Sequence, residues 1–161
     1  MKLNTRTRYA VMALVDLAAL PPGTCASLKE MASRQQLSIS YLEQLFSVLR
    51  RANILVSVRG VTGGYKLALP ADEISVASVV QALDDPIAIT RCRSKGQAGQ
   101  GCLKAGAICK VHHLWADLED RIWAYLSEVS LADVASGRFA EGRALGDIKP
   151  LGFDGQVRQA L

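Results

Sequence analysis

Apolar residues recur at intervals of three and four along the first third of the chain, the period of helices buried along one face. This pattern predicts a first helix over residues 5–20, stopped by a Pro-Pro-Gly sequence. A second helix is predicted over residues 27–36 and a third over residues 40–51. Each of the latter two begins at a serine followed three residues later by a glutamate, the form of a capping box.

The period then changes from helical to extended. Two short runs of strand-forming residues, 54–58 and 65–69, flank a glycine-containing turn and predict a β-hairpin. Three helices followed by a hairpin are typical of a winged helix-turn-helix. The predicted fold class is therefore mainly α with a small β-hairpin wing, extended by a long helix further along the chain.

That long helix is predicted over residues 112–129, after a fourth helix over 75–83 and a glycine-rich loop over 90–111. A short helix over residues 130–135 follows it. Within the long helix, apolar residues alternate at spacings of three and four, the seam of a helix that packs lengthwise on another helix. The residues of this seam are Trp115, Leu118, Ile122, Tyr125 and Val129.

These elements divide the chain into four parts. Residues 1–85 form the expected winged helix-turn-helix domain, 86–111 a cysteine-bearing loop, 112–136 the long helix with its short closing helix, and 137–161 a flexible tail. The chain is 50% hydrophobic and 21% charged, which excludes wholesale disorder. It contains no apolar run of the ~20 residues that span a bilayer and no secretory signal pattern, so we expect a cytoplasmic protein with no membrane partner.

The net charge of +4 is unevenly distributed. Residues 1–66 carry nine Lys/Arg against three Asp/Glu, a balance of +6, whereas residues 67–161 carry ten against twelve, a balance of −2. A basic helix-turn-helix module indicates a polyanion partner, here double-stranded DNA.

The third helix and the hairpin turn supply the residue types that read DNA. Hydroxyls and cations bind phosphates, Gln pairs with adenine, Glu accepts from the cytosine amino group, and arginine enters the minor groove. The candidate DNA-binding residues are Ser38, Ser40, Tyr41, Glu43, Gln44 and Arg50 on the helix, and Arg59 and Gly60 at the wing. Taken singly, Glu43 is also consistent with a role as the capping partner of Ser40. Arg50 and Arg51 are also consistent with a solvent-exposed helix end.

A second group of residues has the chemistry of a metal site. It has the spacing Cys-x9-Cys-x6-Cys-x2-His and consists of Cys92, Cys102, Cys109 and His112. Thiolates in a polar, glycine-rich loop favour metal binding over disulfides or buried thiols. The spacing leaves zinc and an iron–sulfur cluster both open, with the five flanking cations slightly favouring the cluster. His113 is the rival imidazole, and Cys25 fits a packed residue.

Several motifs together resemble the family of winged-helix transcription regulators to which the iron–sulfur cluster regulator IscR belongs. They cover about residues 1–136 and comprise Arg8-Tyr9-Ala10-Val11, the segment Ser38 to Arg50, Val58-Arg59-Gly60 with Gly63-Gly64-Tyr65, Thr90-Arg91-Cys92, and Cys109-x2-His112 followed by Leu114-Trp115.

The resemblance implies a homodimer, not an enzyme, that holds one [2Fe–2S] cluster per subunit through Cys92, Cys102, Cys109 and His112. It also implies that the third helix and the wing contact operator DNA, that the long helix forms the dimer, and that the protein represses cluster-assembly genes. The gap between Cys92 and Cys102 is longer than in the family, which leaves a [4Fe–4S] cluster open. The alternatives are a nitric-oxide- or iron-responsive relative, a winged-helix protein with structural zinc, and an electron-transfer protein.

Overall fold

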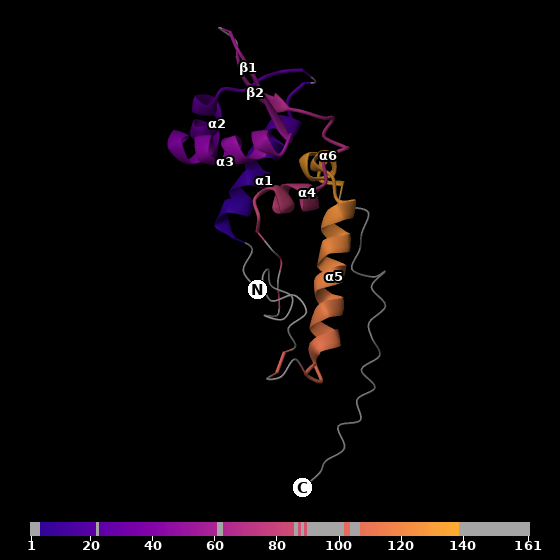
Figure 1. Cartoon of the computed structure of the whole chain (residues 1–161). Coiled ribbons are helices and arrows are strands. Elements are labelled where there is room, and N and C mark those ends of the chain that lie inside the picture. The colour runs from indigo at the N-terminus through magenta and orange to yellow at the C-terminus, as the bar shows by residue number, and fades with distance from the viewer. Residues whose placement is uncertain are drawn as a thin grey trace.

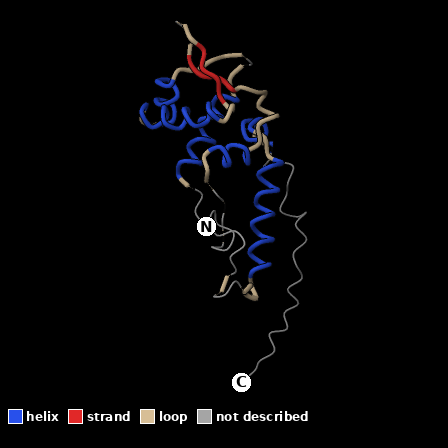
Figure 2. The backbone as a smooth tube through the Cα atoms, viewed as in Figure 1, coloured by secondary structure: helices blue, strands red, loops and turns tan. Residues whose placement is uncertain are grey.

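The computed structural model describes residues 4–21, 23–60, 63–85, 87, 89, 102–103 and 107–138. The elements in this part of the chain are α1 (Thr5–Ala18), α2 (Leu28–Gln35), α3 (Ile39–Arg51), β1 (Leu55–Val58), β2 (Gly64–Leu67), α4 (Val76–Ala82), α5 (His112–Glu128) and α6 (Leu131–Ser136). Figures 1 and 2 show α2, α3 and the hairpin at one end of the molecule and the N-terminal end of α5 toward the other. The predicted mainly α fold with a small hairpin is therefore confirmed.

Short polar side chains start most of these helices, as the sequence predicts. Ser27 accepts a hydrogen bond from the Glu30 amide at 3.2 Å, and the Glu30 carboxylate accepts from the Ser27 amide at 2.9 Å. This reciprocal pair is the predicted capping box of α2. The same arrangement joins Ser130 and Asp133 at the start of α6.

The predicted start of α3 is wrong. The helix begins at Ile39, and its N-cap is Ser38, whose hydroxyl accepts from the Tyr41 amide at 3.2 Å. The capping-box spacing favours Ser40, because Glu43 follows it by three residues, but Ser38 makes the capping bond. Gln36, two residues before Ser38, adopts a left-handed conformation (φ +55°) that ends α2. Glu43 is therefore not a capping partner of Ser40.

The hairpin strands pair in antiparallel register, from Leu55 opposite Leu67 to Val58 opposite Gly64. Ala26 adds a bridge to the outer side of β2, with its amide 3.0 Å from the Tyr65 carbonyl oxygen and its own carbonyl oxygen 2.9 Å from the Tyr65 amide. A Cβ atom on Gly64 would stand 2.4 Å from the Ala26 oxygen, so only glycine permits this approach.

Two apolar clusters hold the elements together. The larger joins α1, α2, α3, β1, α4 and α6, and its fully buried side chains include Leu14, Met31, Phe46, Val79 and Leu131. The smaller joins α4 to the C-terminal part of α5 and consists of Val76, Val80, Ile87 and Val129, with Ile122, Trp123 and Leu126 packed against them. The winged-helix body and the long helix are thus one packed unit at this end of α5.

No helix of the described residues is long and apolar enough to cross a membrane. Residues 139–161, most of the predicted tail, lie outside the described part of the chain.

Candidate DNA-binding surface and cysteine–histidine site

Helix α3 has one buried face and one exposed face. Leu42, Leu45, Phe46 and Leu49 are at most 1% exposed, which fixes the helix against the core. The predicted DNA-binding residues Ser38, Ser40, Glu43, Gln44 and Arg50 are exposed, and Tyr41 is half-buried. The Tyr41 ring meets the Tyr9 ring of α1 edge to face, with 6.0 Å between ring centroids. The helix therefore presents its polar side chains outward from a rigid support.

Two further exposed residues share this outer face. At 100° per residue, Ser47 and Arg51 lie within about 20° of the direction of Ser40, on the same side as Gln44. Ser47 was missed by sequence reasoning, although the spacing of seven residues from Ser40 is the signal that places it there. Arg51 extends the basic pair that begins with Arg50 at the end of the helix.

The wing begins directly after β1. Arg59 and Gly60 are both exposed, and Gly60 has φ +128°, a conformation that side-chain-bearing residues rarely adopt. The Gly63 amide donates to the Gly60 carbonyl oxygen at 3.0 Å and closes the turn. Residues 61 and 62 lie outside the described part of the chain. Arg59 therefore directly follows β1, and the hairpin of β1 and β2 projects from the helical body (Figure 1).

The structure brings two of the four predicted metal ligands together. The Sγ atom of Cys102 lies 3.0 Å from Nδ1 of His112, and both residues are half-buried. Cys109, also half-buried, is on the turn that starts α5, because its carbonyl oxygen accepts from the His112 amide at 3.0 Å. Cys92 lies outside the described residues, and within the described residues no group of three His, Cys, Asp or Glu side chains converges as a metal site.

The other histidine and cysteine considered from the sequence lie apart from this contact. His113 is exposed, and its ring stands perpendicular to that of His112 at 5.3 Å between centroids, so the two imidazoles face different directions. The imidazole in contact with the Cys102 thiol is that of His112. Cys25 is half-buried in the connection between α1 and α2.

The predicted seam of α5 splits into two parts. Val129 is 5% exposed and packs with Val76 and Val80 inside the subunit, and Ile122 packs against the same cluster. Trp115, Leu118 and Tyr125 are 38%, 40% and 44% exposed. The exposed part of the seam is therefore this group of three side chains, while Val129 is a core residue of the subunit.

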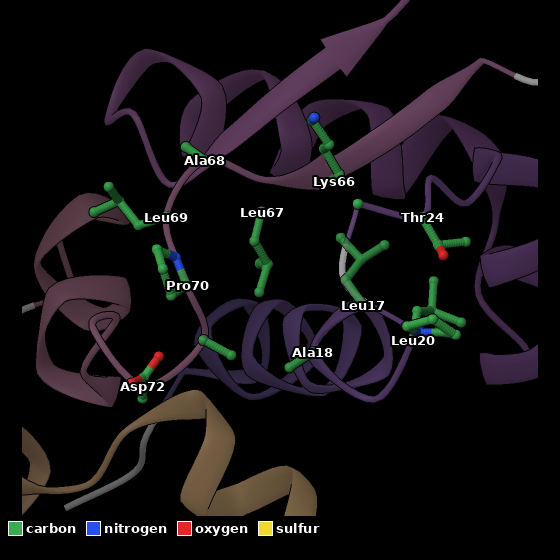
Figure 3. A pocket seen from close by; sticks show the side chains of 13 residues that line it. Leu17, Ala18, Leu20, Thr24, Lys66, Leu67, Ala68, Leu69, Pro70 and Asp72 are labelled. Carbon is green, nitrogen blue, oxygen red and sulfur yellow. The ribbon is translucent and has the colours of Figure 1, made fainter.

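A cavity of about 450 Å³ lies between the C-terminal end of α1 and β2. Figure 3 shows Leu17, Ala18 and Leu67 among its lining side chains. Its lining is mainly apolar, and none of the predicted DNA-binding or metal-ligating residues belongs to it.

Three helices, an exposed third helix and a β-hairpin define a winged helix-turn-helix transcription regulator. The family model described as the Rrf2 iron-dependent transcriptional regulator matches residues 3–137, and the chain belongs to this family. The chain is 43% identical over 134 residues to the transcriptional regulator IscR of Aliivibrio salmonicida, which covers 83% of this chain and 77% of the relative. It is 40% identical over 138 residues to IscR of Cronobacter sakazakii, and this match covers 86% of this chain and 82% of the relative.

Solved structures agree with this assignment. The global cysteine regulator CymR of B. subtilis superposes with a TM-score of 0.72 at 31% identity, over 85% of this chain and 98% of that one. IscR of T. potens gives a TM-score of 0.69 at 33% identity, over 89% of this chain and 93% of that one. The relatives are transcription regulators rather than enzymes, and a regulator of this class binds DNA. The resemblance inferred from the sequence is therefore confirmed.

Proposed function

We propose that this chain is a homodimeric regulator that binds operator DNA through α3 and the wing and senses iron–sulfur status through a [2Fe–2S] cluster. The observation that carries the proposal is the contact between Cys102 and His112, ten residues apart in the sequence and 3.0 Å apart in the structure. With Cys109 on the adjoining turn, three of the four predicted ligands belong to one small region at the start of α5.

The donor set fits an iron–sulfur cluster. Thiolates from Cys92, Cys102 and Cys109 and the neutral imidazole of His112 are the ligand types that such clusters use. When bound, the cluster supplies a redox-sensitive group whose presence reports cluster supply. The chain's own residues hold it, and His112 acts as a ligand through a ring nitrogen that carries no proton.

The proposed DNA contacts divide into positioning and readout. Ser38, Ser40, Tyr41 and Arg50 would hold phosphates, and Gln44 and Glu43 would face base edges in the major groove. Because Glu43 is exposed and is not the cap of Ser40, its carboxylate is available to oppose non-specific phosphate contact. Arg59 with Gly60 at the wing would enter the minor groove.

The exposed part of the α5 seam supports dimerisation. Trp115, Leu118 and Tyr125 expose 38–44% of their surface along one helix, and such apolar side chains mark interaction sites when they gather on one face. We propose that α5 of a second copy of the chain packs against these three side chains. The working division is then a DNA-binding domain over residues 1–85, a cluster loop over 86–111 and a dimerisation segment over 112–136, in a cytoplasmic regulator that represses cluster-assembly genes.

Anaerobic purification tests the cofactor. The proposal expects coloured protein with iron and acid-labile sulfide, two of each per subunit for [2Fe–2S] and four of each for [4Fe–4S]. His112→Ala should lower the visible absorbance, whereas the matched control His113→Ala should leave it at the wild-type level. Colourless protein with stoichiometric zinc would overturn the cluster proposal in favour of a structural zinc site.

Footprinting on the protein's own promoter region tests the DNA role. The proposal expects a protected sequence, and Arg59→Ala should weaken binding and reduce the salt dependence by about one released counterion. Lys66→Ala, a nearby cation on β2 that was not predicted to contact DNA, serves as the control. An electron-transfer protein on the same scaffold would protect no sequence.

A further inference from the structure

The chain leaves α4 along a defined path toward α1. Asp84 has φ +55°, and its amide donates to the Gln81 carbonyl oxygen at 3.0 Å, so the helix is closed by a left-handed turn. The next residue, Asp85, is half-buried and donates its amide to the Val80 carbonyl oxygen at 3.4 Å. The start of the loop that leads to Cys92 therefore has a fixed direction.

The Asp85 carboxylate attaches this point to α1. Its Oδ2 atom accepts from the Thr7 hydroxyl at 2.5 Å and from the Asn4 amide at 3.3 Å. Thr7 is only 2% exposed and Asp85 is half-buried, so this hydrogen bond is partly shielded from water. A carboxylate at the first turn of a helix is also stabilised by the helix dipole. Residues 78 positions apart are thus joined at the N-terminal end of α1.

Two further anchors follow within four residues. Ile87 is 8% exposed and packs in the smaller apolar cluster with α4 and the end of α5. The Ile89 amide donates to Oε2 of Glu119 at 3.2 Å, and Glu119 is 6% exposed on α5. Burying a carboxylate is costly unless hydrogen bonds compensate, so an apolar residue would stabilise this position more cheaply if packing were its only role.

We propose that Asp85, Ile87 and Ile89 form a coupling strap that transmits the state of the cysteine–histidine site to the DNA-binding helix. Ile89 precedes Cys92 by three residues, a reach of at most ~11 Å, so the strap adjoins this predicted ligand along the chain. From the strap, Glu119 leads to α5, and Asp85 leads through Thr7 to α1. The Tyr9–Tyr41 contact then joins α1 to α3. Glu119 and Thr7 are positioning residues in this device. The strap depends on the proposed function in one respect, the identity of the group that Cys92 binds.

The strap can be tested in the full-length protein without a cluster, by amide hydrogen exchange. Two probes report its ends: the Ile89 amide beside Glu119, and the Arg8 amide, which donates to the Asn4 carbonyl oxygen at 3.2 Å in the first turn of α1. Glu119→Ala should raise exchange at Ile89 by about threefold to tenfold, the loss of one hydrogen bond. It should also raise exchange at Arg8 by at least about twofold, because the strap and the Asp85–Thr7 hydrogen bond couple Ile89 to the first turn of α1.

Thr7→Val is the converse variant. It keeps the shape of the side chain, removes the hydroxyl, and should raise exchange at Arg8 and also at the distant Ile89. Glu119→Gln and Thr7→Ser retain the acceptor and the donor and serve as matched controls with near wild-type exchange at both probes. A rise confined to the mutated end overturns the strap, as does an equal rise at the Phe46 amide in the α3 core, which would indicate global destabilisation.

A second measurement separates the strap from the proposed function. In cluster-loaded protein, the ratio of operator affinities with and without the cluster should move toward one in Glu119→Ala and Thr7→Val, while cluster content stays at the wild-type level. Retention of the wild-type ratio in both variants overturns the strap. Wild-type protein without a cluster contradicts the proposed function alone, because the exchange experiment requires none.

Discussion

Ser38 is the residue that caps the proposed recognition helix, and replacing it offers a direct measurement of that role. Its hydroxyl accepts from the Tyr41 amide at 3.2 Å and thereby satisfies one of the amides at the start of α3 that have no partner within the helix. Removing such a cap costs about 1 kcal/mol, within a range of about 0.5–2 kcal/mol. For a domain of this size, that loss lowers Tm by about 2–4 °C.

The matched comparison is Ser40→Ala. Ser40 is exposed on the first turn and accepts no capping bond, so its replacement should change the free energy of unfolding by less than about 0.5 kcal/mol. Ser38→Asp should restore the wild-type value, because aspartate caps as well as serine. Urea unfolding followed by far-UV circular dichroism gives all three values. A larger loss in Ser40→Ala than in Ser38→Ala would refute the assignment, and failure of Ser38→Asp to restore stability would show that capping is not the cause.

Three other outcomes concern the wing, α2 and the dimer. Gly64→Ala should cost about 1–3 kcal/mol of unfolding free energy, because its Cβ would stand 2.4 Å from the Ala26 oxygen and disrupt two hydrogen bonds; urea unfolding against Ser57→Ala checks this. Hydrogen bonds from the Ser27 amide and hydroxyl hold the pKa of Glu30 below its usual 4.5. The loss of unfolding free energy in Glu30→Ala should therefore be fully present above pH 4.5. It should disappear as the pH falls through the lowered pKa, because the carboxylate of the wild-type protein is then protonated. Leu118→Asp should weaken dimerisation by about tenfold or more in sedimentation, and an unchanged dimer would contradict the proposed interface.

Local patterns in the sequence determined most of the secondary structure. The helical period, the Pro-Pro-Gly stop and the serine–glutamate pair at Ser27 predicted α1 and α2, because periodicity and capping act over a few residues. The same reasoning failed at α3, where Ser40 has a glutamate three residues later but Ser38 is the N-cap. The hairpin strands were predicted to within two residues of their observed ends, since strand boundaries depend on pairing partners that local propensity does not include.

The candidate site was predictable in its chemistry and only partly in its arrangement. Spacing identified Cys102 and His112 as metal-ligand types, but their contact depends on how the loop meets the start of α5. Spacing also assigned Val129 to the same seam as Trp115, because one helical stripe looks uniform in a sequence. The packing of α4 against the end of α5 removed Val129 from that stripe, and no local pattern encodes which neighbour covers which turn.

The sequence by itself therefore determined the order of the elements, the basic character of the N-terminal module and the donor set of the cysteine–histidine site. Each of these depends on residue type and short-range spacing. The tertiary structure alone decided the contacts between distant residues, such as Asp85 with Thr7 and Glu119 with the Ile89 amide. These polar contacts form only when packing of the apolar clusters brings their elements together and excludes water from them, which makes them properties of the folded chain.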